Sequence, residues 1–271
     1  MNKTTAENVV TLAGLREDNP RDFLAALGLL RLVDLLWGEA EPSLAWAEGS
    51  HIPLLSSGSP LDVNWADVLV KELKSLATDV RKPLAHGKIV KTDYTTFRNA
   101  VKNSLRFVQS GQAFATLPQM LYASYSSQLE EEGGGVDPSG FSFSNGQSGK
   151  KLLLDVAQLI EMLNGSELLK SIRGEASPVA AKSLRWNPSE FRPAAYRSHD
   201  PGSKLKGDET KDHPALNVLA FFGLTFFPTV PTERGGRTAG FHRGGRNRYF
   251  QWPIWNMPLR VDELATLVGA R

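Results

Sequence analysis

The 271-residue sequence contains no cysteine. This absence excludes disulfide bonds, thiol catalysis and every metal site that needs a cysteine ligand, and it fits a reducing compartment. The opening residues, MNKTTAENVV, lack the long apolar core of a signal peptide, so we expect a cytoplasmic protein. Net charge is also small, at +2 from 31 basic and 29 acidic residues. Affinity for a nucleic acid would therefore have to come from local clusters of basic residues.

The motifs of several enzyme classes are missing as well. There is no GxxxxGK[ST] phosphate loop, no GxGxxG segment after a strand and no GxSxG nucleophile elbow. None of the five histidines has a second ligand at zinc-binding spacing, so we predict no metal and no other cofactor. His199 and His242 could still act as general acid or base in metal-independent RNA cleavage, and this alternative stays open.

Residues 214–232 contain no formally charged residue. The segment is rich in leucine and phenylalanine, but it also contains Asn217, Pro228 and Pro231, and it is only just long enough to cross a membrane. We therefore expect a buried helix that leads into a short strand, with no membrane contact.

Five arginines follow this apolar run, accompanied by one acid, Glu233, and by several glycines. Such a composition predicts a mobile cationic loop, which the apolar residues Phe250, Trp252 and Trp255 would join to the body of the protein. A flexible cluster of positive charge suits a long anionic partner. We therefore predict that nucleic acid contacts Arg234, Arg237, Arg243, Arg246 and Arg248.

Two further segments combine basic and aromatic residues. Residues 184–201 alternate arginine with aromatic residues, a mixture that can hold phosphates and stack on exposed bases. Alternatively, Trp186 and Tyr196 belong to the core and the arginines pair with nearby acids. Residues 94–108 have the spacing of a helix with one basic stripe, which could equally be an ordinary solvated face. The candidate contacts in the two segments are Arg185, Arg192, Arg197, Arg98, Lys102 and Arg106.

The remaining patterns predict an α+β fold with a helix-rich N-terminal part and a mixed C-terminal part. We expect a strand over residues 8–15 and then a central helix that begins at Pro20 and is capped by Asp18 or Asn19. Within that helix, Gly28 and the neighbouring alanines form a patch of small residues that would let another backbone approach closely.

Further along the chain we expect short strands in residues 38–60, an amphipathic helix over 61–76, and one helix over 150–170 with Gly165 near its end. The glycine-rich stretch suggests a flexible linker at 133–149. It would separate an N-terminal part, residues 1–132, from a C-terminal part, residues 150–271.

Three segments, in sequence order, resemble the small Cascade large-subunit-like proteins of type I-U CRISPR systems, also called type I-G. The segments are LAGLREDNPRDFLAALGLLRL, LRWNPSEFRPAAYRSHDP, and NVLAFFGLTFFPTVPTERGGRTAGFHR followed by YFQWPIWNMPL. They cover both ends and the middle of the chain. In the second motif, an acid often precedes the proline of that family, where this chain has Asn187.

The resemblance implies a non-enzymatic, nucleic-acid-binding subunit of an RNA-guided surveillance complex in antiviral defence. The implied partners are the other Cas subunits, CRISPR RNA, target DNA and the helicase-nuclease. Large subunits of such complexes help to recognise the short duplex motif beside the target and stabilise the displaced strand. We expect Asn19 and Asn217, which lie inside the matching motifs, to be structural, as a helix cap and a buried hydrogen-bonding group.

Two alternatives remain from other functional classes. The first is a metal-independent endoribonuclease that processes CRISPR RNA, with His199 or His242 taking part. The second is a structural scaffold whose arginines face acidic protein surfaces. Crosslinking to DNA or RNA would separate the scaffold from a nucleic-acid-binding subunit.

Overall fold

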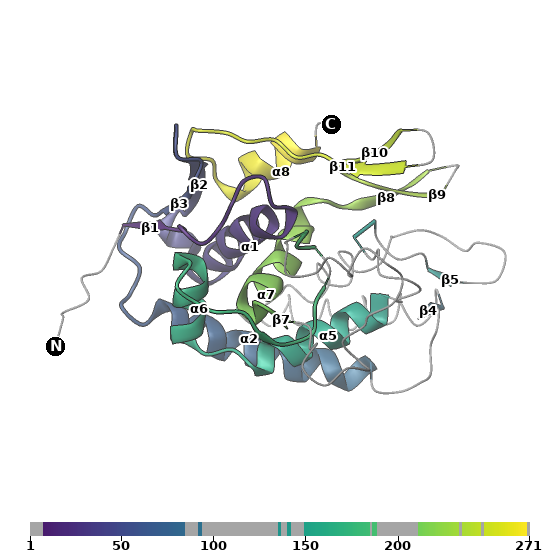
Figure 1. Ribbon diagram of the computed structural model, residues 1–271, viewed down its shortest axis with the longest axis horizontal. Helices are drawn as coiled ribbons and strands as arrows, with labels where there is room; N and C mark the ends of the chain where they lie inside the picture. The colour runs from purple at the N-terminus through teal and green to yellow at the C-terminus, as the bar shows by residue number, and fades with distance from the viewer. Residues whose placement is uncertain are drawn as a thin grey trace.

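The computed structural model describes residues 8–84, 92–93, 135–136, 140–141, 149–184, 186–188, 211–232, 235–244 and 247–269. Helices and small antiparallel sheets occur together in this part of the chain (Figure 1), which confirms the predicted α+β class. The elements before residue 140 are β1 (Val9–Thr11), α1 (Pro20–Trp37), η1 (Gly38–Ala40), β2 (Ser43–Trp46), β3 (Pro53–Ser56), α2 (Trp65–Leu84), β4 (Thr92–Asp93) and β5 (Gly135–Val136).

The elements after residue 140 are mostly helical until residue 226 and then mostly strand. They are α5 (Gly149–Glu161), α6 (Gly165–Arg173), β6 (Val179–Ala180), β7 (Lys211–Asp212), α7 (Pro214–Gly223), η3 (Leu224–Phe226), β8 (Thr229–Thr232), β9 (Gly235–Thr238), β10 (Phe241–Gly244), β11 (Asn247–Phe250) and α8 (Val261–Gly269). Among the helices of the described ranges, none is long and apolar enough to cross a membrane.

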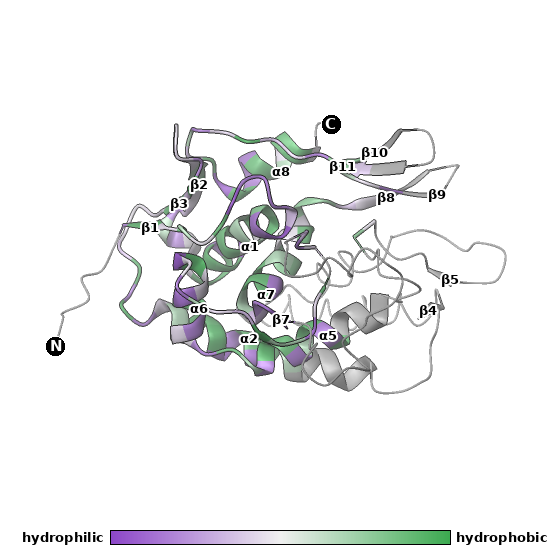
Figure 2. Ribbon diagram, in the orientation of Figure 1, coloured by the Kyte–Doolittle hydropathy of each residue, from purple (hydrophilic) through white to green (hydrophobic). Residues whose placement is uncertain are grey.

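Helices α1 and α7 cross at the centre of the molecule. Asn19 caps α1 as predicted, because its side chain accepts hydrogen bonds from the backbone N–H groups of Arg21 and Asp22. A Cβ atom on Gly28 would lie 1.7 Å from the carbonyl oxygen of Leu219 in α7, so the two backbones touch there. This confirms the predicted close approach at the small-residue patch of α1, whose ribbon is mainly hydrophobic in Figure 2.

A three-stranded antiparallel sheet in the order β1-β3-β2 lies beside α1. The chain returns to this sheet near its C-terminal end, where Leu44 and Leu259 exchange two backbone hydrogen bonds, of 2.9 and 3.0 Å. The N–H of Trp46 donates to the carbonyl of Trp255 at 2.9 Å. The C-terminal segment therefore covers the edge of β2, which would otherwise present unpaired backbone groups.

The single helix predicted over residues 150–170 is wrong, because the structure has two helices, α5 and α6. The break lies at residues 162–164, and Asn164 caps α6 by accepting a hydrogen bond of 2.8 Å from the N–H of Glu167. Gly165 is the first residue of α6 and packs against the side chain of Asp67 in α2. An asparagine within a helical pattern can be the N-cap of a new helix rather than an interior residue. Here the packing of Gly165 against α2 favours the N-cap role of Asn164.

The arginine-rich segment contains two β-hairpins, so the prediction of a loop is wrong for its described residues. Strands β8 and β9 pair from Thr229 with Thr238 to Thr232 with Gly235, and β10 and β11 pair from Phe241 with Phe250 onward. Figure 1 shows the two hairpins extending in the same direction from the end of the molecule near α8. The buried helix leading into a strand is confirmed by α7 and β8.

One hydrophobic core contains residues from both ends of the chain, including Phe23 from α1 and Phe221 from α7. Phe141, inside the range predicted as a linker, is buried in the same core. Most of residues 133–149 lie outside the described ranges, and the predicted domain boundaries stay a prediction.

Candidate nucleic-acid interface

The two hairpins are joined to the body by a cluster of aromatic side chains, which we name the aromatic anchor. Phe250 contacts Phe241, Phe227 and Trp252, with ring centroids 5.0–5.3 Å apart. Phe141 packs edge-on against Phe227, Phe241 and Phe250. Aromatic pairs at such distances add stability beyond that gained from burying their apolar surface. The residues at the base of each hairpin are therefore held in place. The aromatic anchor consists of Phe141, Phe227, Phe241, Phe250 and Trp252.

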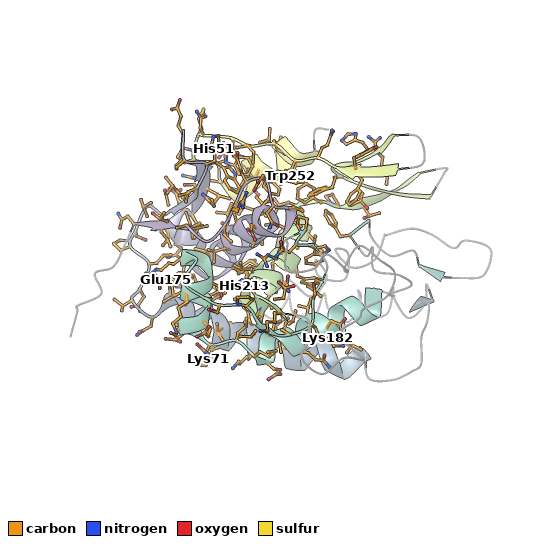
Figure 3. All side chains as sticks on the ribbon, in the orientation of Figure 1. His51, Lys71, Glu175, Lys182, His213 and Trp252 are labelled. Carbon is orange, nitrogen blue, oxygen red and sulfur yellow. The ribbon has the colours of Figure 1, made fainter. Side chains whose placement is uncertain are left out.

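The aromatic anchor continues into the central helix. The ring of Phe23 stacks on Trp252 at 5.4 Å and on Trp46 at 6.0 Å. The indole N–H of Trp252 donates to the carbonyl of Glu17 at 2.9 Å, and that of Trp255 donates to the carbonyl of Leu44 at 2.7 Å. Figure 3 shows Trp252 above α1, between the helix and the hairpins. Residues from the first 50 positions of the chain therefore help to position the hairpins.

Buried threonines fix the first hairpin from its inner face. The hydroxyls of Thr229 and Thr238 lie 2.8 Å apart, and the N–H of Gly140 donates to the hydroxyl of Thr238 at 2.8 Å. Side chains alternate between the faces of a strand, so the next pair in the ladder, Val230 with Arg237, belongs to the opposite face. Arg237 is accordingly exposed to solvent.

Two more of the predicted arginines lie in the strands of the second hairpin. The register places Arg243 directly opposite Arg248, one step beyond the pair His242 and Tyr249. Arg234 and Arg246 lie outside the described residues, between the strands of the first and of the second hairpin respectively. The structure thus brings three of the five predicted contacts, Arg237, Arg243 and Arg248, onto two consecutive hairpins.

The hairpin segment is strongly positive for its length. Residues 229–250 contain five arginines and one glutamate, which gives this segment a net charge of +4. Because the whole chain carries only +2, the other residues together carry −2. A local cluster of positive charge of this kind attracts an anionic partner to the hairpins.

The other two predicted basic surfaces lie outside the described residues. This applies to all six of their candidate contacts, namely Arg185, Arg192, Arg197, Arg98, Lys102 and Arg106. Trp186 is described and is buried, and its indole N–H donates to the carbonyl of Phe141 at 3.0 Å. The core interpretation is therefore confirmed for Trp186, which is unable to stack on a base. Tyr196 lies outside the described residues.

A buried ion cluster, made by Arg21, Asp22 and Asp212, lies where α1 and α7 begin. The guanidinium of Arg21 donates to Asp22 at 2.7 and 2.8 Å and to Asp212 at 2.9 Å, and Arg21 is only 4% exposed. Burial raises the pKa of Asp22 above its ordinary value, against the opposing effect of Arg21. Burial also lowers the pKa of the adjacent His213, which is half-buried at the start of α7 (Figure 3).

A hydrogen bond between two asparagines lies next to the buried ion cluster in the sequence. The side-chain amide of Asn19 donates to the side-chain oxygen of Asn187 at 2.8 Å, which joins the first motif to the second. This contact gives a structural role to Asn187, the position at which the chain departs from the family pattern. Charged side chains this deeply buried are retained only when they are paired, and here they connect β7 to the beginning of α1.

The described histidines and Asn217 make no catalytic arrangement. No group of three metal-ligating side chains occurs in the part of the chain that the structure describes. His51 lies 2.8 Å from a carboxylate oxygen of Glu17, and His242 sits within β10, whereas His199 is outside the described residues. Asn217 is fully buried in α7 as predicted, but neither of its amide atoms has a hydrogen-bond partner among the described residues. The expected hydrogen-bonding role of Asn217 is therefore wrong for this part of the structure.

Sequence reasoning missed two features of this region. The Arg21–Asp212 ion pair joins residues that are 191 positions apart, so no local pattern could indicate it. The second feature is Tyr249, which is half exposed in β11. The sequence predicts a contact for Arg248 and a core position for Phe250, but nothing for Tyr249. Residues 247–250 are two polar residues followed by two aromatic ones, so no alternation in the sequence separates the exposed Tyr249 from the half-buried Phe250.

Comparison of the chain with protein-family models, with curated proteins and with solved structures found no match.

Proposed function

We propose that this protein binds nucleic acid through its two arginine-bearing hairpins, as a cytoplasmic, non-enzymatic subunit of a CRISPR RNA-guided surveillance complex. In that role it would contribute to target DNA recognition and to stabilisation of the displaced strand. Its partners would be CRISPR RNA, target DNA, the other Cas subunits and the helicase-nuclease.

The observation that carries this proposal is the concentration of positive charge on two firmly anchored hairpins. Arg237 is exposed, Arg243 and Arg248 are opposed in one ladder, and the segment carries +4 while the rest of the chain is net negative. Arginine is well suited to such a surface because its planar guanidinium can donate two parallel hydrogen bonds to a phosphate or to guanine.

Anchoring gives the hairpins a second property that favours recognition. The aromatic anchor and the Thr229–Thr238 contact hold the bases of both hairpins before any partner arrives. A preorganised cationic surface loses less conformational entropy on binding than a mobile loop would lose. The family resemblance points to the same class of partner.

The test is a binding titration of labelled target DNA with the reconstituted complex, with and without this chain. One variant replaces Arg237, Arg243 and Arg248 with Ala. The control replaces Lys71, Lys170 and Lys182 with Ala, which removes the same formal charge from other surfaces; Figure 3 shows Lys71 and Lys182 away from the hairpins. Circular dichroism and co-purification establish that both variants fold and join the complex.

We expect the arginine variant to lose target binding and the lysine variant to keep it. If both variants lost target binding to the same extent, overall charge rather than the hairpins would account for the loss. Unchanged binding in the arginine variant would overturn the proposal and favour the scaffold, and cleavage of repeat RNA that depends on His242 would favour the endoribonuclease.

A further inference from the structure

The β10–β11 hairpin has two chemically different faces. Directly opposed residues of an antiparallel ladder share a face, and successive pairs alternate between the two faces. The pair Phe241 with Phe250 belongs to the inner face, because both rings pack against Phe141. The next pair, His242 with Tyr249, therefore belongs to the outer face.

Tyr249 is the aromatic residue that this outer face presents to solvent. Its exposed fraction is 50%, and it is the one aromatic among the large hydrophobic residues found exposed in the described ranges. The opposed His242 adds a second flat ring that is half-buried. Two rings therefore stand at directly opposed positions on adjacent strands.

The strand that carries Tyr249 is held in place by its neighbours, and an exposed arginine lies on the outer face of the next hairpin. Phe250, the neighbour of Tyr249 in sequence, is held by rings on both sides, Phe227 at 5.1 Å and Trp252 at 5.0 Å. The next pair of positions in the ladder, Arg243 with Arg248, alternates back to the register of the inner face. The outer face of the first hairpin, β8–β9, carries the exposed Arg237.

We infer that Tyr249, with His242 beside it, is a stacking platform for an unpaired base, and that the hairpins bind single-stranded nucleic acid. The exposed Arg237, on the outer face of the neighbouring hairpin, would contact a phosphate of the same strand. This inference rests on the proposed function and specifies its substrate as a single strand.

A single strand fits this surface better than a duplex does. Within a duplex both faces of every base are covered by neighbouring bases, so a tyrosine ring has nothing to stack on. In a single strand each base has an accessible face, and binding by stacking together with basic side chains tolerates any sequence. Both single-stranded DNA and single-stranded RNA offer this chemistry.

The test measures anisotropy of labelled oligonucleotides of about 20 nucleotides with the full-length protein. Four probes of equal length are used: single-stranded DNA, single-stranded RNA, duplex DNA, and a single strand with abasic sites in place of its bases. The variants are Tyr249→Ala, Tyr249→Leu and Tyr249→Phe. Met257→Ala is the matched control, because Met257 is 66% exposed and lies outside the hairpins.

We expect Tyr249→Ala and Tyr249→Leu to weaken binding of single strands about five- to 150-fold, which corresponds to the loss of one stacked base. Tyr249→Phe keeps the ring and should bind like the unmodified protein, as should Met257→Ala. The abasic strand has the same phosphates without bases, so its affinity should be unchanged by Tyr249→Ala. The single strand that binds more tightly, DNA or RNA, identifies the kind of nucleic acid that the hairpins bind.

Two outcomes overturn the inference while leaving the proposed function intact. The first is that Tyr249→Ala and Tyr249→Leu bind single strands as tightly as the unmodified protein, while the triple arginine variant binds weakly. The second is that Tyr249→Ala loses equal affinity for single, duplex and abasic probes. If the unmodified protein binds none of the probes, both the inference and the proposed function fail.

Discussion

Arg21 is the residue whose neutralisation has the largest expected effect on stability. It is 4% exposed, and its partners Asp22 and Asp212 are 3% and 2% exposed. With Arg21 removed, Asp22 and Asp212 would both lose the buried guanidinium that they contact, and breaking a buried pair in this way costs about 3–5 kcal/mol. The cluster therefore makes the beginning of α1 and the strand before α7 depend on each other.

Replacing Arg21 with Met should lower the free energy of unfolding by about 3–5 kcal/mol at neutral pH, and part of the loss should return near pH 5. The pKa of Asp22 is already raised by burial, and it rises further when the opposing guanidinium is gone. A raised pKa means that the folded state binds a proton more readily than the unfolded chain. Stability therefore increases as the pH falls through the folded pKa.

Urea denaturation at both pH values measures this effect. The control is Arg260→Met, because Arg260 and its partner Glu41 are both more than half exposed and such a pair contributes at most about 1 kcal/mol. The same pH dependence in Arg21→Met and in the unmodified protein would contradict the prediction.

Gly28 allows the closest backbone contact between α1 and α7. Gly28→Ala should lower the melting temperature, since the new Cβ would lie 1.7 Å from the carbonyl oxygen of Leu219 and overpacking of this kind costs about 1–3 kcal/mol or more. Gly38→Ala is the matched control: a Cβ there meets nothing within 4 Å, and the φ of −55° suits alanine. Thermal melts that show equal shifts for the two variants would mean that the helix crossing is not tightly packed.

At the scale of elements, the parts that could be predicted are those with a strong local signal. The pattern Asn19-Pro20 followed by an apolar run predicts α1 and its cap, and the uncharged segment predicts α7. The break between α5 and α6 could not be predicted, because leucines on both sides of Asn164 continue the helical spacing. It is the packing of Gly165 on Asp67 that distinguishes the two helices.

The two hairpins could not be predicted from the composition of their segment either. Glycine and arginine have no strong preference for strands, and the segment becomes a sheet because Phe241 and Phe250 pack on Phe141 from another part of the chain. At the candidate site, the charge of the arginines could be predicted from the sequence. Their arrangement, and the exposure of Tyr249, depend on contacts between residues more than 90 positions apart.

Asn164→Ala tests the break between α5 and α6. The loss of the cap leaves the N–H of Glu167 without its acceptor, and the free energy of unfolding should fall by about 1 kcal/mol. Asn164→Asp keeps an acceptor at the same position and should retain full stability, since a negative charge is also favourable at the beginning of a helix. Denaturant titrations compare the two variants, and equal loss in both would argue against a capping role.

At the scale of the whole molecule, the net charge of +4 on the hairpin segment predicts a strong dependence of binding on salt. Neutralising one phosphate-contacting arginine should reduce the slope of log K against log salt by roughly one, and should weaken binding about equally for all sequences. Arg237→Ala is the variant for this experiment, because Arg237 is exposed.

Lys182→Ala serves as its control, since Lys182 lies 3.3 Å from Asp155 away from the hairpins. Titrations with two unrelated sequences at several salt concentrations measure the slope. A loss confined to one sequence would assign Arg237 to base reading, with a cost of about 1–3 kcal/mol for the preferred base.

The closure of the β2 edge by residues 255–259 has a consequence for synthesis of the chain on the ribosome. Trp46 and Phe23 are made early, but their partner Trp255 is translated more than 200 residues later. Until it emerges, the nascent chain exposes aromatic surface and the open edge of a strand, both of which promote aggregation. The edge of the N-terminal sheet is therefore closed only after residues 255–259 have been synthesised.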